Sequence, residues 1–291
     1  MIVHLVDGTY ELFRHFYGAR KALPRRSPAE GQRDEGGPDQ PLGGVNGVLG
    51  TIVQMLHEGA THIGVATDRV IESFRNDLWP GYKRGDGIDA ALWAQFRPLE
   101  DALVAMGVTT WPMVELEADD ALASAAHLAS QDPRVEKVCI WTPDKDLAQC
   151  VSDDRVVQVD RRSGQIRNAA RVREKFGVDP AYIADYLALV GDASDGYPGI
   201  PGIGKVSAAR LLNQYGPIED FPEKLLVGKR EQALLFKRLA TLRTDALLFS
   251  DVDQLRWRGP TSTFAELTTK MGEPRLLVRA IAVAAKLTNS K

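Results

Sequence analysis

The chain has 291 residues, of which 44% are hydrophobic and 26% are charged, a composition typical of an ordinary soluble globular protein. This length allows one large domain or two smaller domains packed closely together. No apolar run approaches the roughly 18 residues that a membrane span needs, and the first residues lack the pattern of a secretion signal, so we expect a cytoplasmic protein without a membrane segment.

The net charge of −3 argues weakly against a nucleic-acid partner, but the charge is unevenly distributed. Nine of the 39 acidic residues fall in a few short motifs, and the 30 that remain are outnumbered by 36 Lys and Arg residues. An acidic pocket in a basic body suits metal ions together with a polyanionic substrate. The two cysteines, Cys139 and Cys150, lack zinc-like spacing, and we expect both to be structural.

In chain order, short apolar runs alternate with segments of helical character. Strands are predicted over residues 2–6, 62–67, 109–114, 135–142 and 156–159. Helices are predicted over residues 10–18, 45–57, 92–106 and 119–129. Strands that alternate with helices in this way predict a parallel sheet that is covered by helices on both faces.

Two stretches interrupt this pattern, because residues 20–44 and 76–90 are rich in Gly, Pro and charge and are predicted to be irregular. After about residue 170 the strand signals fade. Helices are predicted over residues 180–190, 206–215 and 229–243. We therefore expect an α/β core over residues 1–175 and a helical region over residues 176–291, packed on that core.

Acidic residues follow the predicted strands. In an open α/β sheet, ligands bind beyond the carboxyl ends of the strands, and in a parallel sheet these ends share one edge. Three apolar runs end in acids, and the run that ends near residue 114 is followed by acids at the start of a helix. The acids placed in this way are Asp7, Asp68, Glu117, Asp119, Asp120, Asp144 and Asp146.

Each of these acids also has an ordinary explanation. Asp7 and Gly8 could form a plain turn, Asp144 could cap a helix, and the acids of 117–120 could complement a helix dipole, worth about 0.3–1 kcal/mol each. Jointly these explanations fail, because several like charges within a few ångströms repel strongly unless cations neutralise them. Hard oxygen ligands favour Mg²⁺ or Mn²⁺, and a pair of such ions, roughly 3.5–4 Å apart, is a recurrent device for phosphodiester hydrolysis.

A glycine-rich hairpin is predicted downstream, within residues 191–209. It opens with Asp192 and Asp195, three residues apart, and leads into a helix that starts near Lys205. Glycines let a backbone approach a phosphate closely, and the helix start offers amide groups to it, so the hairpin should hold DNA backbone without reading its sequence. The glycines concerned are Gly199, Gly202 and Gly204.

At these motifs the chain resembles the 5′-nuclease (flap endonuclease) superfamily, which includes the nuclease domain of bacterial DNA polymerase I. The resemblance implies a PIN-like α/β fold followed by a helix–three-turn–helix DNA-binding unit. Because 291 residues leave no room for a polymerase, we expect a stand-alone nuclease. The matching segments lie in family order at residues 5–8, Asp68 with 73–75, 81–83, 117–120, 142–147, 191–195, 199–204 and 239–245.

The resemblance also implies a reaction, the Mg²⁺- or Mn²⁺-dependent cleavage of 5′ flaps or removal of nucleotides from 5′ ends of DNA. By motif position, one metal group is Asp7, Asp68, Glu117, Asp119 and Asp120, and the other is Asp144, Asp146, Asp192 and Asp195. The basic residues expected at the scissile phosphate are Arg14, Arg75, Lys83 and Arg84. Lys205 and Ser207 join the three glycines as expected DNA contacts, with Ser207 placed to help backbone carbonyls hold K⁺.

Three departures from the family pattern concern substrate preference rather than the metal ligands. Gly196 stands where the family usually has Asn, Val206 stands where it usually has Lys, and the stretch 80–92 is short and glycine-rich, so the sequence leaves open whether an ordered helical arch forms there. Two other hypotheses remain: a DNA-binding protein of this fold that cuts poorly, and a PIN-like ribonuclease that acts on single-stranded RNA. The sequence identifies no protein partner.

Overall fold

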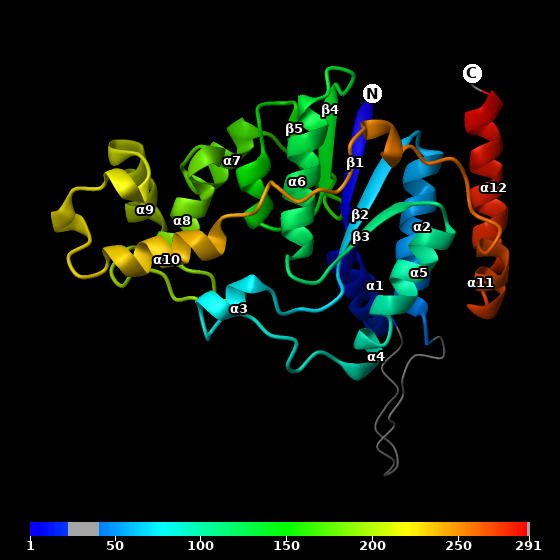
Figure 1. Ribbon diagram of the computed structural model, residues 1–291, viewed down its shortest axis with the longest axis horizontal. Coiled ribbons are helices and arrows are strands. Elements are labelled where there is room, and N and C mark those ends of the chain that lie inside the picture. Colours follow the sequence, from blue (N-terminus) through cyan, green and yellow to red (C-terminus); the bar gives the residue numbers. More distant parts are fainter. Residues whose placement is uncertain (23–40, 290–291) are drawn as a thin grey trace, which may run out of the picture.

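The computed structural model describes residues 1–22 and 41–289, and its centre is a six-stranded sheet (Figure 1). The strand order is β3-β2-β1-β4-β5-β6, and the first five strands of the chain are parallel, as predicted. The short sixth strand was not predicted and pairs antiparallel with β5. The strands are β1 Ile2–Asp7, β2 His62–Asp68, β3 Thr109–Met113, β4 Lys137–Trp141, β5 Val156–Asp160 and β6 Gln165–Arg167.

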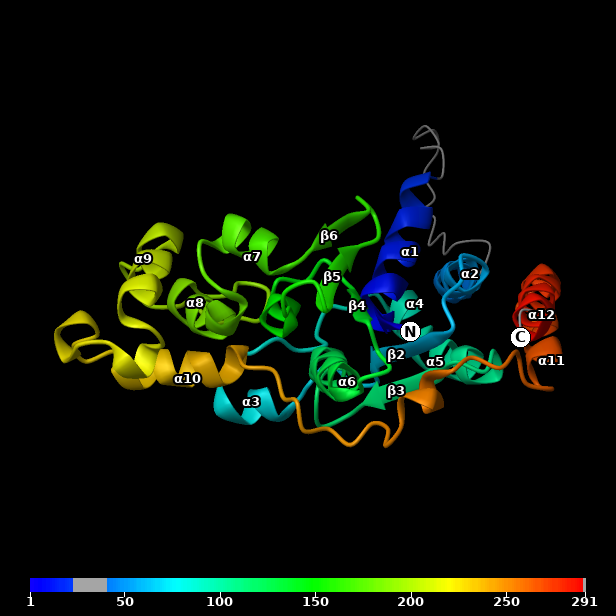
Figure 2. The same ribbon diagram turned by 90° about the horizontal axis from the view of Figure 1, so that it is seen from above.

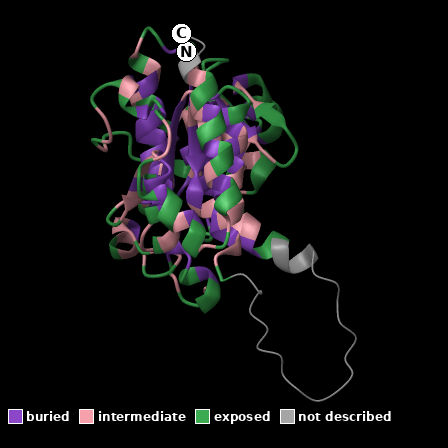
Figure 3. Cartoon of the chain, turned by 90° about the vertical axis from the view of Figure 1, so that its right-hand side faces the viewer, coloured by how far each residue is buried: buried purple, intermediate pink, exposed green. Residues whose placement is uncertain are grey.

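Helices cover both faces of this sheet, so the predicted α/β class is confirmed (Figure 2). Because side chains alternate along a strand, Val3 and Leu5 of β1 pack with helix α6, whereas Val6 packs into the core on the opposite face. Buried residues, drawn in purple, occupy the centre of the molecule in Figure 3. The covering helices are α6 Ala118–Gln131 on one face and α1 Gly8–Ala22, α2 Gly43–His57 and α5 Phe96–Ala105 on the other.

The helical region after the sheet has a core of its own, built around Leu187, Tyr197 and Phe236. It projects to one side of the sheet in Figure 1. Its helices are α7 Ala169–Phe176, α8 Ile183–Val190, α9 Lys205–Tyr215 and α10 Arg230–Ala240. Short 3₁₀ turns are η1 Asp146–Cys150, η2 Pro180–Tyr182, η3 Ile218–Asp220, η4 Glu223–Leu225 and η5 Val252–Leu255.

The last two helices, α11 Phe264–Lys270 and α12 Pro274–Asn289, lie away from this region, at the other end of the molecule (Figure 1). Phe264, Leu276, Ala280 and Val283 join the core formed by α2 and α5. The C-terminal third of the chain is therefore helical, as expected, but its helices pack against the α/β core at two separate places. Within the described ranges, no helix is long and apolar enough to cross a membrane.

Some predicted boundaries were wrong. The predicted helix over 92–106 divides into α4 Ala90–Trp93 and α5, because Gln95 turns inward and accepts hydrogen bonds from the amides of Gly44 and Val45 at the start of α2. Within the predicted loop 20–44, residues 20–22 belong to α1 and Gly43 starts α2, whereas residues 23–40 lie outside the described residues. The predicted irregular stretch 76–90 contains the end of a short helix, α3 Phe74–Leu78.

A histidine on the central strand gives the fold a pH dependence. His4 accepts a hydrogen bond from Trp141 Nε1 at 3.0 Å, and burial, with His62 nearby, lowers the pKa of His4 from 6.5 to about 4. Between these pH values the unfolded chain binds the proton more readily, so stability is lost as pH falls from 6.5 to 4, by up to about 3 kcal/mol. Urea titrations at pH 6.5 and pH 4 measure the loss of stability. The loss should be smaller in His4→Gln than in the wild type, and it should be unchanged in the control His127→Gln, which replaces an exposed histidine.

Candidate metal centre

The carboxyl ends of β1, β2 and β4 bring acidic side chains to one edge of the sheet. In the parallel pairing of β1 with β2, Asp7 is the register partner of Ala66, two residues before Asp68. Asp144 and Asp146 follow β4, with Asp146 opening the turn η1. The acids that follow these strands therefore lie at the same edge of the sheet, as predicted.

Asp7 is held from two sides. Its Oδ1 accepts a hydrogen bond from the Tyr10 amide at 2.8 Å, and its Oδ2 accepts one from Thr142 Oγ1 at 3.0 Å. Burial raises the pKa of Asp7 to about 7, and the charges of Asp68 and Asp144 contribute to this rise. A carboxylate fixed in this way is oriented before any ligand arrives, and it resists ionisation until a cation neutralises its neighbours.

Asp68 is fixed by the helix on the other side of the cluster. Its Oδ1 accepts a hydrogen bond from the Ala118 amide at the start of α6, at 2.8 Å. Its own amide donates to Thr9 Oγ1, also at 2.8 Å. Burial raises the pKa of Asp68, and Glu117 adds to this effect.

Two triads of carboxylates stand out among the described residues. Oxygens of Asp119, Asp144 and Asp146 lie within 4.8 Å of one another, and so do oxygens of Asp146, Asp192 and Asp195. Asp146 is shared by both triads. Asp119 thus groups with Asp144 and Asp146, across the boundary between the two predicted metal groups.

The triads carry strong mutual repulsion. Burial raises the pKa of Asp119 and of Asp146 well above the ordinary range, and in both cases Asp144 is the next largest cause. The Oδ1 atom of Asp146 is buried without a hydrogen-bond partner in the described part of the chain. An orphaned carboxylate oxygen among like charges fits a divalent cation, because hard oxygen donors are the ligands that such ions prefer.

Two lysines lie inside the acidic cluster. Lys83 Nζ is 2.7 Å from Glu117 Oε2 and 3.1 Å from Asp195 Oδ1, so it bridges the two predicted metal groups. Burial alone would lower the pKa of Lys83, but Glu117 and Asp195 raise it well above its ordinary value. Lys145 Nζ lies 2.5 Å from Asp192 Oδ2. Lys145 had no predicted role, although its place in the sequence between Asp144 and Asp146 was a signal of one.

The structure corrects the expectations for Arg75 and Asp120. Both side chains are buried, and the two guanidinium nitrogens of Arg75 donate to the two carboxylate oxygens of Asp120 at 2.7 Å each. Arg75 Nε also donates to the Leu239 carbonyl, while the amides of Glu117 and Arg243 donate to Asp120. Arg75 therefore joins α3, α6 and the end of α10 inside the protein, and both carboxylate oxygens of Asp120 are occupied by hydrogen bonds from these segments.

Of the other predicted side chains, Glu117 is buried, whereas Arg14 and Arg84 lie closer to the surface. Glu117 accepts hydrogen bonds from Ser73 Oγ at 2.7 Å and from Arg75 Nη1 at 3.1 Å, in addition to its ion pair with Lys83. Arg84 is exposed, in the segment between α3 and α4. Arg14 is half-buried on α1 and pairs with Glu11.

The predicted glycine hairpin is present between α8 and α9. Gly199 has a φ of 72°, and a Cβ there would lie 2.4 Å from the Gly191 nitrogen, so this glycine permits a close approach of two backbone segments. Gly202 and Gly204 have open space around them, and Gly204 precedes the exposed Lys205 at the start of α9. Ser207 Oγ donates to the Gly204 carbonyl at 2.9 Å.

Gly196, one of the departures from the family pattern, has a packing reason. Its φ is 82°, and a Cβ at this position would lie 1.9 Å from the Gly81 carbonyl oxygen. Trp79 Nε1 donates to the Gly196 carbonyl, and the Lys83 amide donates to the Asp195 carbonyl, both at 3.0 Å. The segment that carries Lys83 is therefore docked against the turn that carries Asp195.

Comparison with known protein families agrees with this arrangement. A model described as "5′-3′ exonuclease, N-terminal resolvase-like domain" matches residues 2–177, and one described as "5′-3′ exonuclease, C-terminal SAM fold" matches residues 178–263. The chain belongs to the 5′–3′ exonuclease family. The family resemblance predicted from the motifs is thereby confirmed.

Curated members of the 5′–3′ exonuclease family include both long and short proteins. The chain is 32% identical over 271 residues to DNA polymerase I of Pseudomonas aeruginosa, with 86% of this chain and 28% of that protein covered. It is 30% identical over 267 residues to a 5′-3′ exonuclease of Aquifex aeolicus, with 89% and 87% covered. The chain thus spans less than a third of the polymerase and nearly the whole of the Aquifex protein.

Solved structures share the fold of this family member. The T5 D15 protein co-crystallised with metal ions aligns with a TM-score of 0.64 at 16% identity, covering 98% of this chain and all of that one. The catalytic core of Rad2 in complex with DNA substrate aligns with a TM-score of 0.57 at 14% identity, covering 96% and 91%. Both confirm the predicted fold of a helix-covered sheet followed by a helical region.

Proposed function

We propose that this chain is a divalent-metal-dependent 5′ nuclease that hydrolyses DNA by recognising its structure rather than its sequence. The observation that carries the proposal is the pair of carboxylate triads that share Asp146 at the carboxyl edge of the sheet. Membership of the 5′–3′ exonuclease family supports it. The proposed setting is DNA replication or repair in the cytoplasm.

We assign two metal positions to the triads, with Mg²⁺ or Mn²⁺ as the proposed ions. Asp119, Asp144 and Asp146 would hold one ion, and Asp146, Asp192 and Asp195 would hold the other. When bound, such ions lower the barrier to hydrolysis by neutralising charge on the attacking and leaving oxygens. The residues around them contribute by position. Asp7, Asp68 and Glu117 are the remaining acids of the cluster and are proposed to act as outer ligands of the ions.

The basic residues are proposed to hold the scissile phosphate. Lys83 is the best placed, because its Nζ already lies among the candidate ligands while its side chain remains about one-third exposed. Exposed Arg84 follows it and is proposed as a second contact, with Arg14 on α1 as a third. The proposed role of Lys83 is to orient the phosphate, since charge-assisted hydrogen bonds fix both distance and direction.

The helical region is proposed to hold uncut duplex through the glycine hairpin. Residues 1–175 would form the α/β unit and 176–291 the helical unit, a division supported by the change between family models after residue 177. Hairpin carbonyls, aided by Ser207, are further proposed to bind K⁺. If so, DNA affinity should be higher in K⁺ than in Na⁺ at equal ionic strength.

Cleavage of 5′-labelled DNA tests the function directly. Flap, nicked and blunt duplexes incubated with Mg²⁺ or Mn²⁺ should yield short 5′ products, and EDTA should abolish them. A matched RNA flap serves as the substrate control. Cleavage of the RNA flap but not of the DNA flap would identify a ribonuclease, whereas tight metal-independent DNA binding without cleavage would identify a poorly active binding protein.

Divalent ions should also stabilise the folded protein, because they relieve the repulsion among the buried carboxylates. At a hundredfold excess over the Kd, binding contributes about 2.7 kcal/mol, which corresponds to a Tm increase of about 5–10 °C for a chain of this size. Differential scanning fluorimetry with and without Mg²⁺ or Mn²⁺ measures this increase. The Asp146→Asn variant should lose most of it, and a wild-type Tm indifferent to millimolar ions would contradict a preformed site.

Lys205 tests the hairpin. It is exposed at the first position of α9, beside glycines that offer backbone to a phosphate. Lys205→Ala should weaken duplex binding equally for different sequences and reduce the salt slope by about one unit, while leaving cleavage at saturating DNA nearly unchanged. Anisotropy titrations over a salt series measure both quantities, with Lys270→Ala on α11 as a control. Normal binding combined with lost turnover would instead place Lys205 in the active site.

A further inference from the structure

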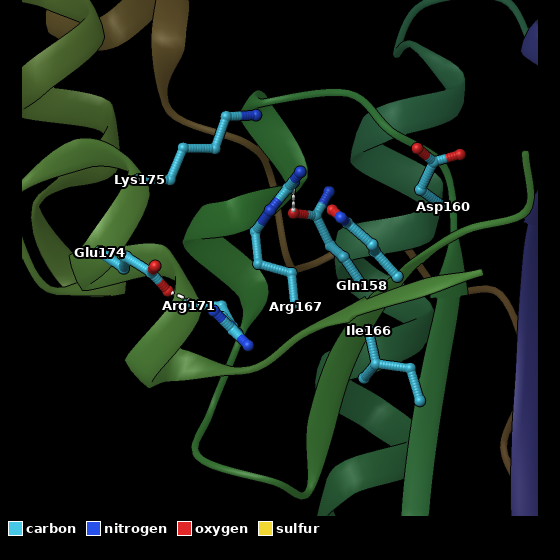
Figure 4. A pocket seen from close by; sticks show the side chains of 8 residues that line it. Gln158, Asp160, Ile166, Arg167, Arg171, Glu174 and Lys175 are labelled. Atoms are coloured by element: carbon cyan, nitrogen blue, oxygen red, sulfur yellow. Dashed lines mark hydrogen bonds and ion pairs between the residues drawn. The ribbon is translucent and has the colours of Figure 1, made fainter. Parts of the chain in front are cut away.

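A polar pocket lies beside the metal centre, between the β5–β6 hairpin and helix α7. It has a volume of about 680 Å³. Figure 4 shows Arg167 of β6 and Lys175 of α7 extending toward the same side of this pocket from opposite walls. A pocket with two cations directed into it suits an anionic ligand.

The acids that line the pocket are already engaged. Glu174 pairs with Arg171 at 2.6 Å, and Asp160 accepts a hydrogen bond from Ser163 Oγ at 2.8 Å in the turn of the hairpin. Neither Arg167 nor Lys175 forms an ion pair with any residue that the structure describes. Two cations therefore share the pocket without an ion pair of their own, while each lining carboxylate already has a closer partner.

The contacts of the two cations compensate their charge only in part, because Asp160 attracts both side chains without forming an ion pair with either. Arg167 Nη1 donates to Gln158 Oε1 at 2.7 Å, and Lys175 Nζ lies 5.0 Å from the centroid of the Phe176 ring. Burial lowers the pKa of both side chains, and repulsion from Arg167 lowers the pKa of Lys175 further. A bound anion would relieve both the burial cost and the repulsion.

The pocket is connected to both parts of the proposed DNA path. Gln158 Nε2 donates to the carbonyl of Asp144 at 2.6 Å, so the residue that holds Arg167 also contacts the backbone of a candidate metal ligand. At the other end, Asn213 of α9 donates to the carbonyl of Gly177, directly after α7, at 2.7 Å. The pocket thus lies between the metal centre and the helix that follows the glycine hairpin.

We propose that this pocket binds a backbone phosphate of the DNA, in the part of the substrate that runs from the hairpin to the metal centre, through Arg167 and Lys175. The choice of DNA as ligand rests on the proposed function. The volume accommodates a phosphate with its neighbouring sugars, and a contact to the phosphate adds affinity without sequence preference.

The test is DNA binding by the double variant Arg167→Gln/Lys175→Gln. Anisotropy of a labelled nicked duplex, measured in EDTA over a salt series, gives affinity without cleavage. Removing two phosphate contacts should make the salt slope shallower by about two units and weaken binding about tenfold at low salt. The control Arg134→Gln/Lys270→Gln removes the same charge from exposed positions, one in the turn before β4 and one at the end of α11, and should leave the slope nearly unchanged.

Two further measurements make the result decisive. The charge-retaining variant Arg167→Lys/Lys175→Arg should recover most of the salt slope, which loss by misfolding would not allow. Titration of the wild-type protein with dAMP tests for a free nucleotide as the occupant. The proposal is overturned if the double Gln variant has the same salt slope and DNA affinity as its control. It is also overturned if dAMP binds the pocket while the two substitutions leave the DNA affinity unchanged. Because none of these readouts involves cleavage, an inactive wild-type enzyme would count against the proposed function alone.

Discussion

Replacement of Asp146 by Ala is expected to reduce cleavage of a DNA flap by at least about a thousandfold. Asp146 is the one residue whose oxygens belong to both carboxylate triads, so its loss weakens both proposed metal positions at once. Each 1.36 kcal/mol of lost transition-state stabilisation lowers the rate about tenfold, and a metal ion contributes several kcal/mol. Single-turnover rates at saturating DNA and metal measure the effect, and Asp144→Ala/Asp146→Ala should be at least as slow.

The stability of the same variant separates lost chemistry from lost structure. Removal of a buried carboxylate from a cluster of like charges should raise the Tm of the metal-free protein, because the native state loses repulsion. The control Asp101→Ala removes an exposed acid from α5 and should change neither rate nor Tm appreciably. A folded Asp144→Ala/Asp146→Ala variant that cuts at the wild-type rate would remove the basis of the metal assignment.

The grouping of acids at one edge of the sheet could be predicted because it follows from short segments of the sequence. An apolar run that ends in an acid places that acid at a strand terminus, and parallel pairing then brings Asp7, Asp68 and Asp144 to one side. The glycine hairpin could be predicted for a similar reason, since positive φ at Gly199 and Gly202 is a property of the segment itself. Short-range signals of this kind survive in a single sequence.

The partners of each acid could not be predicted, because they come from distant segments. The spacing of Glu117 and Asp120 places both on one face of α6, but it does not say whether that face meets the metal cluster or the core. The orientation of that face depends on Arg75, which precedes α6 in the chain, and on the end of α10, which lies more than 100 residues after Asp120. The same applies to Asp119, whose neighbours Asp144 and Asp146 come from the segment after β4.

Two of the unpredicted elements, β6 and α7, were too short or too charged for pattern analysis. β6 has three residues, which is too few to show alternation, and α7 carries four charged residues among its eight. Both belong to the walls of the pocket that holds Arg167 and Lys175. Functional interpretation of that region therefore required the arrangement in space.

The buried ion pair of Arg75 with Asp120 leads to the largest expected effect on stability. Arg75→Met leaves the Asp120 carboxylate buried without its guanidinium partner, and breaking such a pair from one side typically costs about 3–5 kcal/mol. Urea denaturation measures this loss. By contrast, Arg134→Gln breaks ion pairs that are exposed and should leave the urea midpoint nearly unchanged.

A double-mutant cycle distinguishes this structural role from the phosphate contact that the motif suggested. In Arg75→Met/Asp120→Leu no unpaired charge remains at position 120, so the double variant should regain much of the stability lost by Arg75→Met. Glu117 keeps Lys83 and Ser73 as partners in both variants. If Arg75 instead served the substrate, Arg75→Met would leave the urea midpoint unchanged and slow cleavage at saturating DNA. Restored stability in the double variant therefore assigns Arg75 to the architecture that positions α6, and through it Asp119, beside the metals.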